Sequence, residues 1–411
     1  MKNYYLEQVK KDKGLILILI ACICIFSFAD LLYFLSVVSG KTLTTIYSVV
    51  IVFFVYAAVN LLSLKSPKDR YFGQIFPIFI LYSFVTVARG FTFSYQDLKS
   101  YLQSPYVFWP FVIPLFCYFK PSITLLACLF RRLYNLAILF LISCLFFTEL
   151  IISRGPAQII IPTLVFGSGL LLLNSSYLLG RKVNIVFVAI LIGTLAFIYL
   201  ARRNAVVTLS GFVIGAYVFH RYNKANVKLF RFFPLIIALL LFFTISVQSF
   251  SERLTGRLSE RIYEDSRTDL YDLFYLGMMD DIFFGKGMGG KYYAPTGGSE
   301  VEGVYFEQVD YRDVIETGYL QLILNGGVLY LILYLLVLVP AIVRALTKSN
   351  NYLVKSCGIS LILWLIDMFI FGLPQLNIQY ILIWICVGIC YDPTLREKDN
   401  TYVSNIFKIE F

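Results

Sequence analysis

Long apolar stretches recur along this chain and constrain its fold more than any other feature. The first runs from Leu15 to Val38 and contains one charged residue, Asp30. About 20 consecutive apolar residues form a helix long enough to cross a hydrocarbon core roughly 30 Å thick. Of the 411 residues, 59% are hydrophobic and 15% are charged. Since a water-soluble domain carries about 25% charged residues, the surface of this protein must face an apolar medium.

Hydropathy divides the chain into twelve predicted membrane-spanning helices. They lie at residues 15–38, 43–64, 72–89, 105–119, 133–152, 158–179, 183–201, 204–220, 232–249, 318–343, 353–373 and 377–391. The sequence therefore predicts an all-α polytopic membrane protein. Nine spans fall in residues 1–249 and three in 318–391, with a large loop at 250–317 and a tail at 392–411. Three prolines, Pro105, Pro110 and Pro114, predict a kinked fourth span.

Basic residues indicate the orientation of these spans. One set of alternate connections shares its side with the basic N-terminus and carries Lys65, Lys68, Arg70, Lys120, Arg131, Arg132, Arg181, Lys182, Arg221, Lys224, Lys228, Arg231, Arg344, Lys348 and Lys355. The opposite set carries Lys41, Arg89, Lys99, Arg154, Arg202 and Arg203. Because Lys and Arg accumulate on the cytoplasmic side, both termini are predicted to be cytoplasmic and the 250–317 loop to lie outside.

Several classes of function are excluded or disfavoured by the same survey. The net charge of +10 does not indicate a nucleic-acid partner, because the basic residues are scattered between spans and form no single basic face. All eight cysteines lie in or beside apolar runs, so neither a disulfide framework nor a metal site is predicted. The single histidine, His220, lies at a span end, a position that argues against a histidine general base. No cofactor is predicted.

The 250–317 loop holds most of the polar residues that could carry chemistry. It is acidic overall, with fourteen Asp and Glu against seven Lys and Arg. Ser266 is a predicted N-cap, and an amphipathic helix follows in which Leu270, Leu273, Phe274 and Gly277 share a face. The glycines of residues 285–290 lack the spacing of a nucleotide-binding loop and predict an irregular turn that returns the chain to the membrane surface.

Three arginines stand out as candidate anion ligands. Arg202 and Arg203 lie between two apolar spans with almost no connection around them, and Arg267 begins the amphipathic helix. Arginine at a membrane edge can extend its charged end to the lipid headgroups. Alternatively, its planar guanidinium can pair with two oxygens of a phosphate at once. The sequence leaves both interpretations open.

Two acids precede the tenth span. Asp313 and Glu316 are predicted to lie about one helical turn apart near the outer membrane surface, beside Arg312 and Tyr319. A half-buried carboxylate there could accept a proton from a sugar hydroxyl. It could equally cap the start of the span and be stabilised by the helix dipole. Position alone does not separate these two roles.

These residues form motifs that point to a known family. The motifs are Arg202-Arg203-Asn204, the run from Ser266 to Phe274, the run from Asp281 to Gly289, and the run from Glu316 to Tyr330. Together with the many spans and one large outer loop, they resemble the O-antigen polymerase and ligase family of the bacterial envelope. Such proteins are similar to membrane-embedded glycosyltransferases of the GT-C type. Family ligases usually carry a histidine near the position of Glu316, and its absence here favours the polymerase branch.

The resemblance implies a metal-independent, inverting glycosyl transfer without a cofactor. The implied substrates are oligosaccharide repeat units on undecaprenyl diphosphate, at the periplasmic face of a bacterial inner membrane. Arg202, Arg203 and Arg267 would neutralise the diphosphate leaving group, with Arg312 and Tyr319 as further substrate ligands. Glu316, or failing it Asp313, would act as the base. A chain-length regulator is an implied protein partner, in addition to membrane lipid.

Two alternatives remain open. One is an O-antigen ligase or another transferase of lipid-linked glycans. The other is a flippase or transporter for lipid-linked oligosaccharides, without chemistry. A flippase is expected to place polar residues through the bundle core, whereas the apolar spans here contain few acids: Asp30, Glu149 and Asp367.

Overall fold

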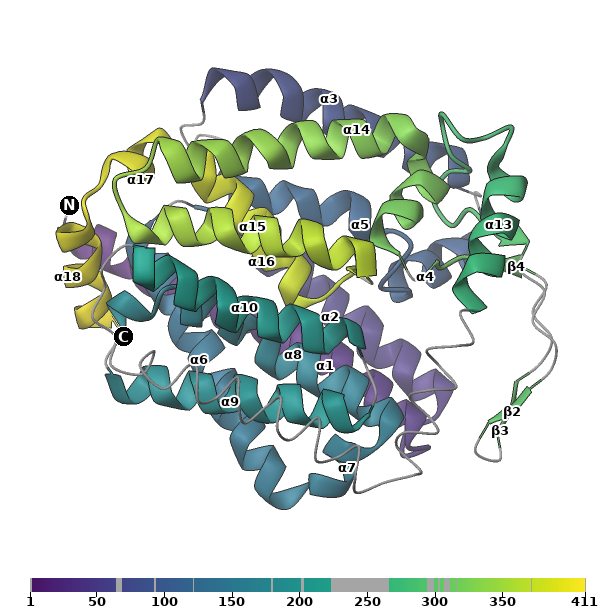
Figure 1. Cartoon of the computed structure of the whole chain (residues 1–411), viewed down its shortest axis with the longest axis horizontal. Helices are drawn as coiled ribbons and strands as arrows, with labels where there is room; N and C mark the ends of the chain where they lie inside the picture. Colours follow the sequence, from purple (N-terminus) through teal and green to yellow (C-terminus); the bar gives the residue numbers. More distant parts are fainter. Residues whose placement is uncertain are drawn as a thin grey trace.

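The protein is a bundle of α-helices with very little sheet (Figure 1). The structure, a computed structural model, describes residues 2–63, 69–91, 94–120, 122–178, 180–200, 203–222, 266–293, 299–301, 304–306, 311–315, 317–370 and 372–410. The helices are α1 (Lys2–Phe34), α2 (Gly40–Leu61), α3 (Arg70–Gly90), α4 (Tyr95–Gln103), α5 (Trp109–Val112), η1 (Ile113–Tyr118), α6 (Ile123–Phe146), α7 (Thr148–Ile152), α8 (Arg154–Leu173), η2 (Ser175–Tyr177), α9 (Gly180–Tyr199), α10 (Arg203–Tyr222), α13 (Ser266–Met278), α14 (Gly318–Thr347), α15 (Tyr352–Ile370), α16 (Ile378–Cys390), α17 (Pro393–Glu397) and α18 (Asn400–Glu410). Four short strands are β1 (Tyr292–Tyr293), β2 (Ser299–Val301), β3 (Val304–Phe306) and β4 (Tyr311–Arg312). They form two antiparallel pairs, β1 with β4 and β2 with β3.

Eight helices within the described ranges are long and apolar enough to cross a membrane. They are Val9–Tyr33, Gly40–Leu61, Arg70–Gly90, Ile123–Phe146, Pro156–Leu173, Gly180–Tyr199, Gly318–Thr347 and Tyr352–Phe369. Three shorter apolar helices are Trp109–Tyr118, Ala205–Arg221 and Ile378–Cys390. Each of these overlaps a predicted stretch, so a multi-pass, all-α membrane protein is confirmed. The predicted span at residues 232–249 lies outside the described residues.

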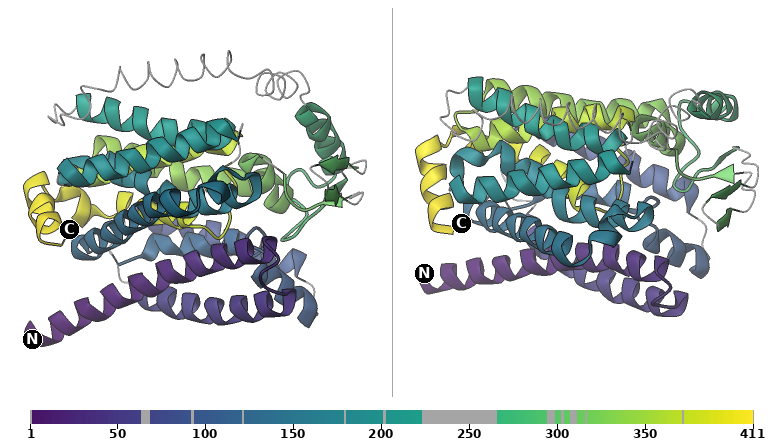
Figure 2. Two further views of the ribbon diagram at one scale, coloured as in Figure 1. Left: turned by 90° about the horizontal axis from the view of Figure 1, so that it is seen from below. Right: turned by 60° about the horizontal axis from the view of Figure 1, so that its bottom comes forward.

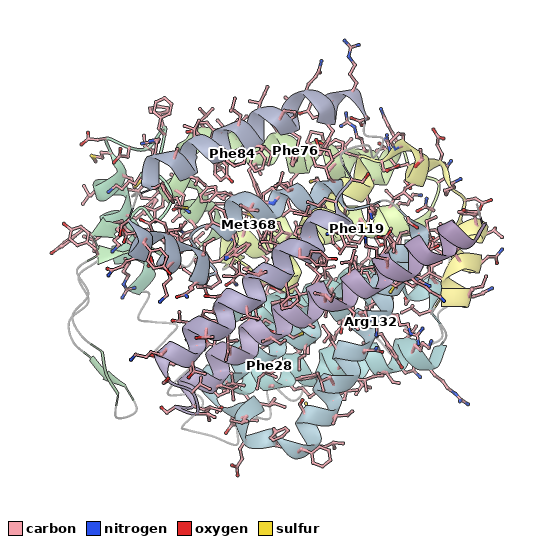
Figure 3. The ribbon with its side chains drawn as sticks, turned by 180° about the vertical axis from the view of Figure 1, so that it is seen from behind. Phe28, Phe76, Phe84, Phe119, Arg132 and Met368 are labelled. Atoms are coloured by element: carbon pink, nitrogen blue, oxygen red, sulfur yellow. The ribbon has the colours of Figure 1, made fainter. Side chains whose placement is uncertain are left out.

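The predicted start of the fifth span is wrong by ten residues. The fifth span was expected from residue 133, but α6 begins at Ile123 and includes Arg131 and Arg132. The two adjacent charges lower the hydropathy, so the predicted span begins after them. Arginine is nevertheless a good helix former, and the helix continues through both residues. Arg131 is exposed, and Arg132, labelled in Figure 3, is half-buried. The basic pair is therefore part of the helix and not of a connection.

The bundle has two distinct ends. Both chain termini, α17 and α18 lie at one end, here named the terminal end, and α13 with the strands lies at the other, named the loop end (Figure 1). The two further views show the same separation (Figure 2). The residues predicted as a plain tail, 392–411, fold as α17 and α18. Phe407 packs its ring 5.4 Å from both Phe130 and Tyr177, so the tail closes the terminal end.

The centre of the bundle is packed with aromatic rings. Phe79 of α3 stacks on Tyr330 of α14 with centroids 5.3 Å apart, and on Trp384 of α16 at 5.6 Å. The outward face of α3 is apolar too, since Phe84 is exposed on the same helix that buries Phe76 (Figure 3). An exposed apolar face is expected of a helix whose surroundings are lipid tails.

Helix α16 is shorter than its neighbours. It has 13 residues, all buried, and is about 20 Å long at 1.5 Å per residue, whereas α3 has 21 residues. Its final turn is level with the start of α3, because the amide of Asp69 donates to the carbonyl oxygen of Tyr391 at 3.2 Å. The difference in length therefore falls at the loop end, where Asn377 caps the start of α16 by accepting from the amide of Tyr380.

Candidate active site at the loop end

Helix α13 forms where the sequence predicts it and packs on the start of α14. Phe274 and Met278 are fully buried in a small apolar cluster that also contains Tyr292 and Leu324. The hydroxyl groups of Tyr271 and Thr317 lie 3.0 Å apart. Arg267 lies one helical turn before Tyr271, so its backbone is held near the start of α14.

The segment before α14 is extended and not helical. Arg312 pairs with Tyr292 in the β1–β4 ladder. The side chain of Gln321 binds the next residues, accepting from the amide of Ile315 at 2.8 Å and donating to the carbonyl of Asp313 at 3.1 Å. Asp313 itself is exposed.

This geometry corrects the prediction for the two acids. Because α14 begins at Gly318 and residues 311–315 are not helical, Asp313 neither lies in a helical turn with Glu316 nor caps the span. The N-cap residue is Thr317, without a side-chain cap bond. Strand pairing with residues twenty positions earlier keeps this segment extended. Glu316 and Arg202 lie outside the described residues.

Tyr319 joins two helices. Its hydroxyl donates to the carbonyl oxygen of Leu365 in α15 at 2.7 Å, and its ring centroid lies 4.4 Å from that of Phe369. The hydroxyl donor is therefore engaged within the bundle, and the role of Tyr319 in substrate binding stays a prediction. Tyr319 holds the start of α14 against the end of α15.

Helix α14 is broken at Gly327, which has φ of +73° and ψ of −179°. A break in a membrane helix frees backbone groups that must find partners within the protein. The turn after α13 supplies them. The amides of Lys286 and Gly287 donate to the carbonyl oxygens of Leu324 and Asn325, both at 2.8 Å, and the amide of Val328 donates to the carbonyl of Ile282 at 2.8 Å.

The same turn is fastened to α3. The guanidinium of Arg89 donates to the carbonyl oxygens of Phe284 and Gly285 at 2.6 and 2.7 Å. The predicted irregular turn is confirmed, since Gly285, Gly287 and Gly289 all have positive φ. It returns the chain not to a free surface but into the break of α14.

Sequence reasoning did not assign a role to Asp367, which the structure places in a polar cluster at the loop end. Asp367 of α15 accepts a hydrogen bond from the hydroxyl of Thr208 in α10 and one from the amide group of Gln379 in α16, the latter at 3.3 Å. The signal was present, because an acid inside an apolar span usually serves a function. Its partners, however, are distant in sequence.

These contacts connect the predicted charged positions. Tyr271 joins α13 to the start of α14, Tyr319 joins α14 to α15, and Asp367 joins α15 to α10. Arg203 is the first residue of α10, five positions before Thr208. The helix starts that carry Arg203 and Arg267 therefore belong to one connected group of helices at the loop end.

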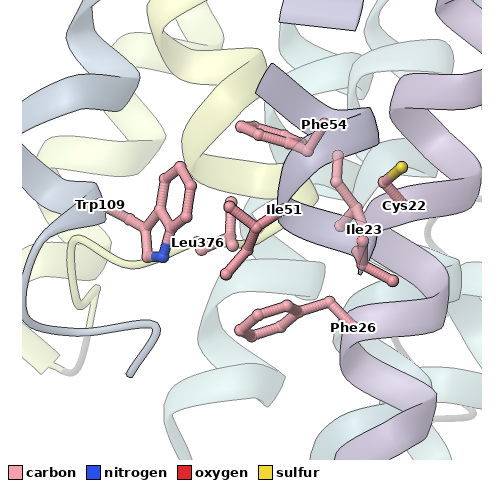
Figure 4. A pocket seen from close by; sticks show the side chains of 8 residues that line it. Cys22, Ile23, Phe26, Ile51, Phe54, Trp109 and Leu376 are labelled. Atoms are coloured by element: carbon pink, nitrogen blue, oxygen red, sulfur yellow. The ribbon is translucent and has the colours of Figure 1, made fainter. Parts of the chain in front are cut away.

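Two further features of the described residues bear on ligand binding. No three His, Cys, Asp or Glu side chains gather there in a group that could hold a metal ion. A small pocket between α1, α2 and α5 is lined by apolar side chains, among them Phe26, Phe54, Trp109 and Leu376 (Figure 4). Such a lining fits an apolar group and offers nothing to a sugar or phosphate.

The chain matches no family model, no curated protein and no solved structure. Any functional assignment therefore rests on the residues themselves. At the loop end lie the helix starts that carry Arg203 and Arg267, the hydrogen-bonded carboxylate of Asp367, and the turn that supplies backbone partners to the break in α14.

Proposed function

We propose that this protein polymerises lipid-linked oligosaccharide repeat units into O-antigen or a related surface polysaccharide. The observation that carries the proposal is the connection of α13, α14, α15 and α10 at the loop end through Tyr271, Tyr319 and Asp367. This connection places the helix starts that carry Arg267 and Arg203 in the same group of helices as the carboxylate of Asp367. The motif resemblance described above supports the same reading.

The proposed topology has twelve spans, with the ninth at residues 232–249. Helix α10 ends at the terminal end and α13 lies at the loop end, at opposite ends of the bundle. The distribution of Lys and Arg favours a cytoplasmic terminal end and a periplasmic 250–317 loop in a bacterial inner membrane.

In the proposed reaction, the oxygen of an acceptor sugar hydroxyl attacks the anomeric carbon of the donor. The bond from that carbon to the diphosphate oxygen breaks on the opposite face, its electron pair leaves with undecaprenyl diphosphate, and the configuration inverts. Arg202, Arg203 and Arg267 stabilise the charge that develops on the diphosphate, which is commonly the largest contribution to such catalysis. Glu316 takes the hydroxyl proton, with Asp313 as the substitute.

The test is extension of lipid-linked repeat units by the purified protein in liposomes. The expected products carry two or more repeats on one undecaprenyl diphosphate, with release of free undecaprenyl diphosphate. Transfer of single units to a lipid A-type acceptor would identify a ligase instead. Movement of the units across the membrane without any new glycosidic bond would identify a flippase. Either of these results would overturn the proposal.

A further inference from the structure

Three polar side chains from three helices meet at the loop end. The Thr208 hydroxyl and the Gln379 amide each donate to a different oxygen of Asp367. Asp367 lies three residues before Ile370, the last residue of α15. It directly precedes Met368, which is labelled in Figure 3. All three polar residues lie within about one and a half turns of the loop end of their helices.

This cluster is buried without being sealed. The solvent-exposed fraction is 6% for Thr208, 6% for Asp367 and 8% for Gln379. Gln379 is the second residue of the short helix α16, whose missing length falls at the loop end. Residues 372–377, which precede α16, are not helical. Non-helical backbone within a membrane protein is tolerated where it is buried in protein or lines a polar space.

The hydrogen-bond chemistry of the cluster selects its ligand. The Thr208 hydroxyl and the Gln379 amide both donate to the carboxylate of Asp367, and a carboxylate has about four acceptor sites on its two oxygens. The cluster therefore offers acceptors and negative charge to a ligand. It suits a hydroxyl donor and disfavours a diphosphate, which needs donors and positive charge.

The position of the cluster relates it to the arginine at the start of α10. Thr208 follows Arg203 by five residues, about 7.5 Å along the helix axis. A charged residue in a membrane helix is costly and usually serves a function. The two positions differ in chemistry. Arg203 carries a positive charge at the start of α10, whereas the cluster five residues further along offers hydrogen-bond acceptors.

We propose that Thr208, Asp367 and Gln379 form the subsite for the acceptor sugar, binding its hydroxyl groups. This proposal rests on the proposed polymerase function. Asp367 here is a binding residue, whereas the proton-accepting role stays with Glu316 or Asp313. The donor diphosphate and the acceptor sugar then occupy separate positions along α10 and α15.

The experiment is a two-substrate assay in liposomes. The donor is an undecaprenyl-diphosphate-linked polymer at fixed concentration, and the acceptor is the single lipid-linked repeat unit, varied. Loss of a hydrogen bond to a charged group weakens binding by about one to two powers of ten. Asp367→Asn keeps the shape of the side chain, so we expect the acceptor KM to rise tenfold or more while the donor KM and kcat change less than threefold.

The matched control is Asp30→Asn. Asp30 is another carboxylate within a span, hydrogen-bonded by the hydroxyl of Tyr47, and has no part in the proposed site. It should leave both KM values within twofold. If Asp367→Asn does not accumulate in the membrane, Thr208→Val, which keeps the carboxylate, should raise the acceptor KM at least threefold.

An unchanged acceptor KM in these variants, with extension by the wild-type protein intact, would overturn the subsite and leave the polymerase function standing. A fall of kcat with both KM values unchanged would also overturn it. Absence of extension by the wild-type protein would overturn the proposed function, and this inference with it.

Discussion

The position that a Cβ atom would take on Gly285 lies 2.5 Å from the amide nitrogen of Gly327. Reciprocally, a Cβ on Gly327 would lie 2.1 Å from the carbonyl oxygen of Phe283. The turn after α13 and the break in α14 can approach this closely only because both positions are glycine. A turn from the large loop thereby becomes part of the spanning bundle.

Alanine at Gly327 is expected to destabilise the protein. The backbone there has φ of +73° and ψ near 180°, a region essentially restricted to glycine, and the strain costs about 1–3 kcal/mol before the clash is counted. The measurement is the apparent Tm in detergent, which should fall by several degrees for Gly327→Ala and for Gly285→Ala. Gly73→Ala is the control, because nothing lies within 4 Å of that Cβ position on α3. An unchanged Tm in both test variants would contradict the close approach.

A second prediction concerns the terminal end. Asp69 forms an ion pair with Arg344, whose guanidinium lies 4.8 Å from the ring centre of Tyr71 and 5.2 Å from that of Tyr391. Asp69→Asn leaves this half-buried guanidinium without its carboxylate, so we expect a loss of about 1–3 kcal/mol. Thermal unfolding of Asp69→Asn, Arg344→Gln and the double variant measures it.

The double variant should lose less than the sum of the two single variants, because each removes the same interaction. Glu397→Gln removes an exposed carboxylate from the same end and should change the Tm little. Strictly additive losses would show that Asp69 and Arg344 act independently.

The spans were predictable because their signal is local. About 20 apolar residues in sequence are sufficient to define a membrane helix, and eleven of the predicted stretches are helical in the described residues. The boundary of α6 was missed because Arg131 and Arg132 lower the hydropathy without ending the helix. Local composition thus identifies a helix better than it locates its ends.

The site was less predictable because it depends on contacts between distant residues. An acid within an apolar run, such as Asp367, is visible in the sequence. Its partner is not, because Thr208 and Asp367 are 159 positions apart. Asp313 was expected in a helix, yet the pairing of Arg312 with Tyr292 keeps the chain extended there. Likewise, Gly326 and Gly327 are visible in the sequence, whereas the turn that completes the broken helix is about forty residues earlier.

The proposed orientation predicts which connections a membrane-impermeant thiol reagent can reach. In intact spheroplasts, cysteine introduced by Ser299→Cys should react, because residue 299 belongs to the predicted outer loop. Cysteine introduced by Asn226→Cys should react only after the membrane is permeabilised. The unchanged chain gives the background, since its cysteines are buried or half-buried. The reverse pattern would invert the topology and remove the proposed site from the outer face.

The last prediction separates the two interpretations of the arginines. An arginine that only extends its charge to lipid headgroups can be replaced by lysine with little effect. A diphosphate ligand needs the planar guanidinium, and lysine supplies a point charge without two-point pairing. If each lost contact is worth about 1.5–3 kcal/mol, the polymerisation rate of Arg203→Lys or Arg267→Lys should fall roughly tenfold to a hundredfold.

The measurement is the chain-length distribution of the glycan on a gel, with the amount of protein checked by blot. Arg131→Lys is the matched control, because Arg131 is exposed on α6 and belongs to the basic set predicted for the cytoplasmic side. Glu316→Gln, which removes the proposed base while keeping its size, should spare donor binding and abolish extension. Normal ladders from both lysine variants would assign Arg203 and Arg267 to the membrane interface. A normal ladder from Glu316→Gln would move the base to Asp313.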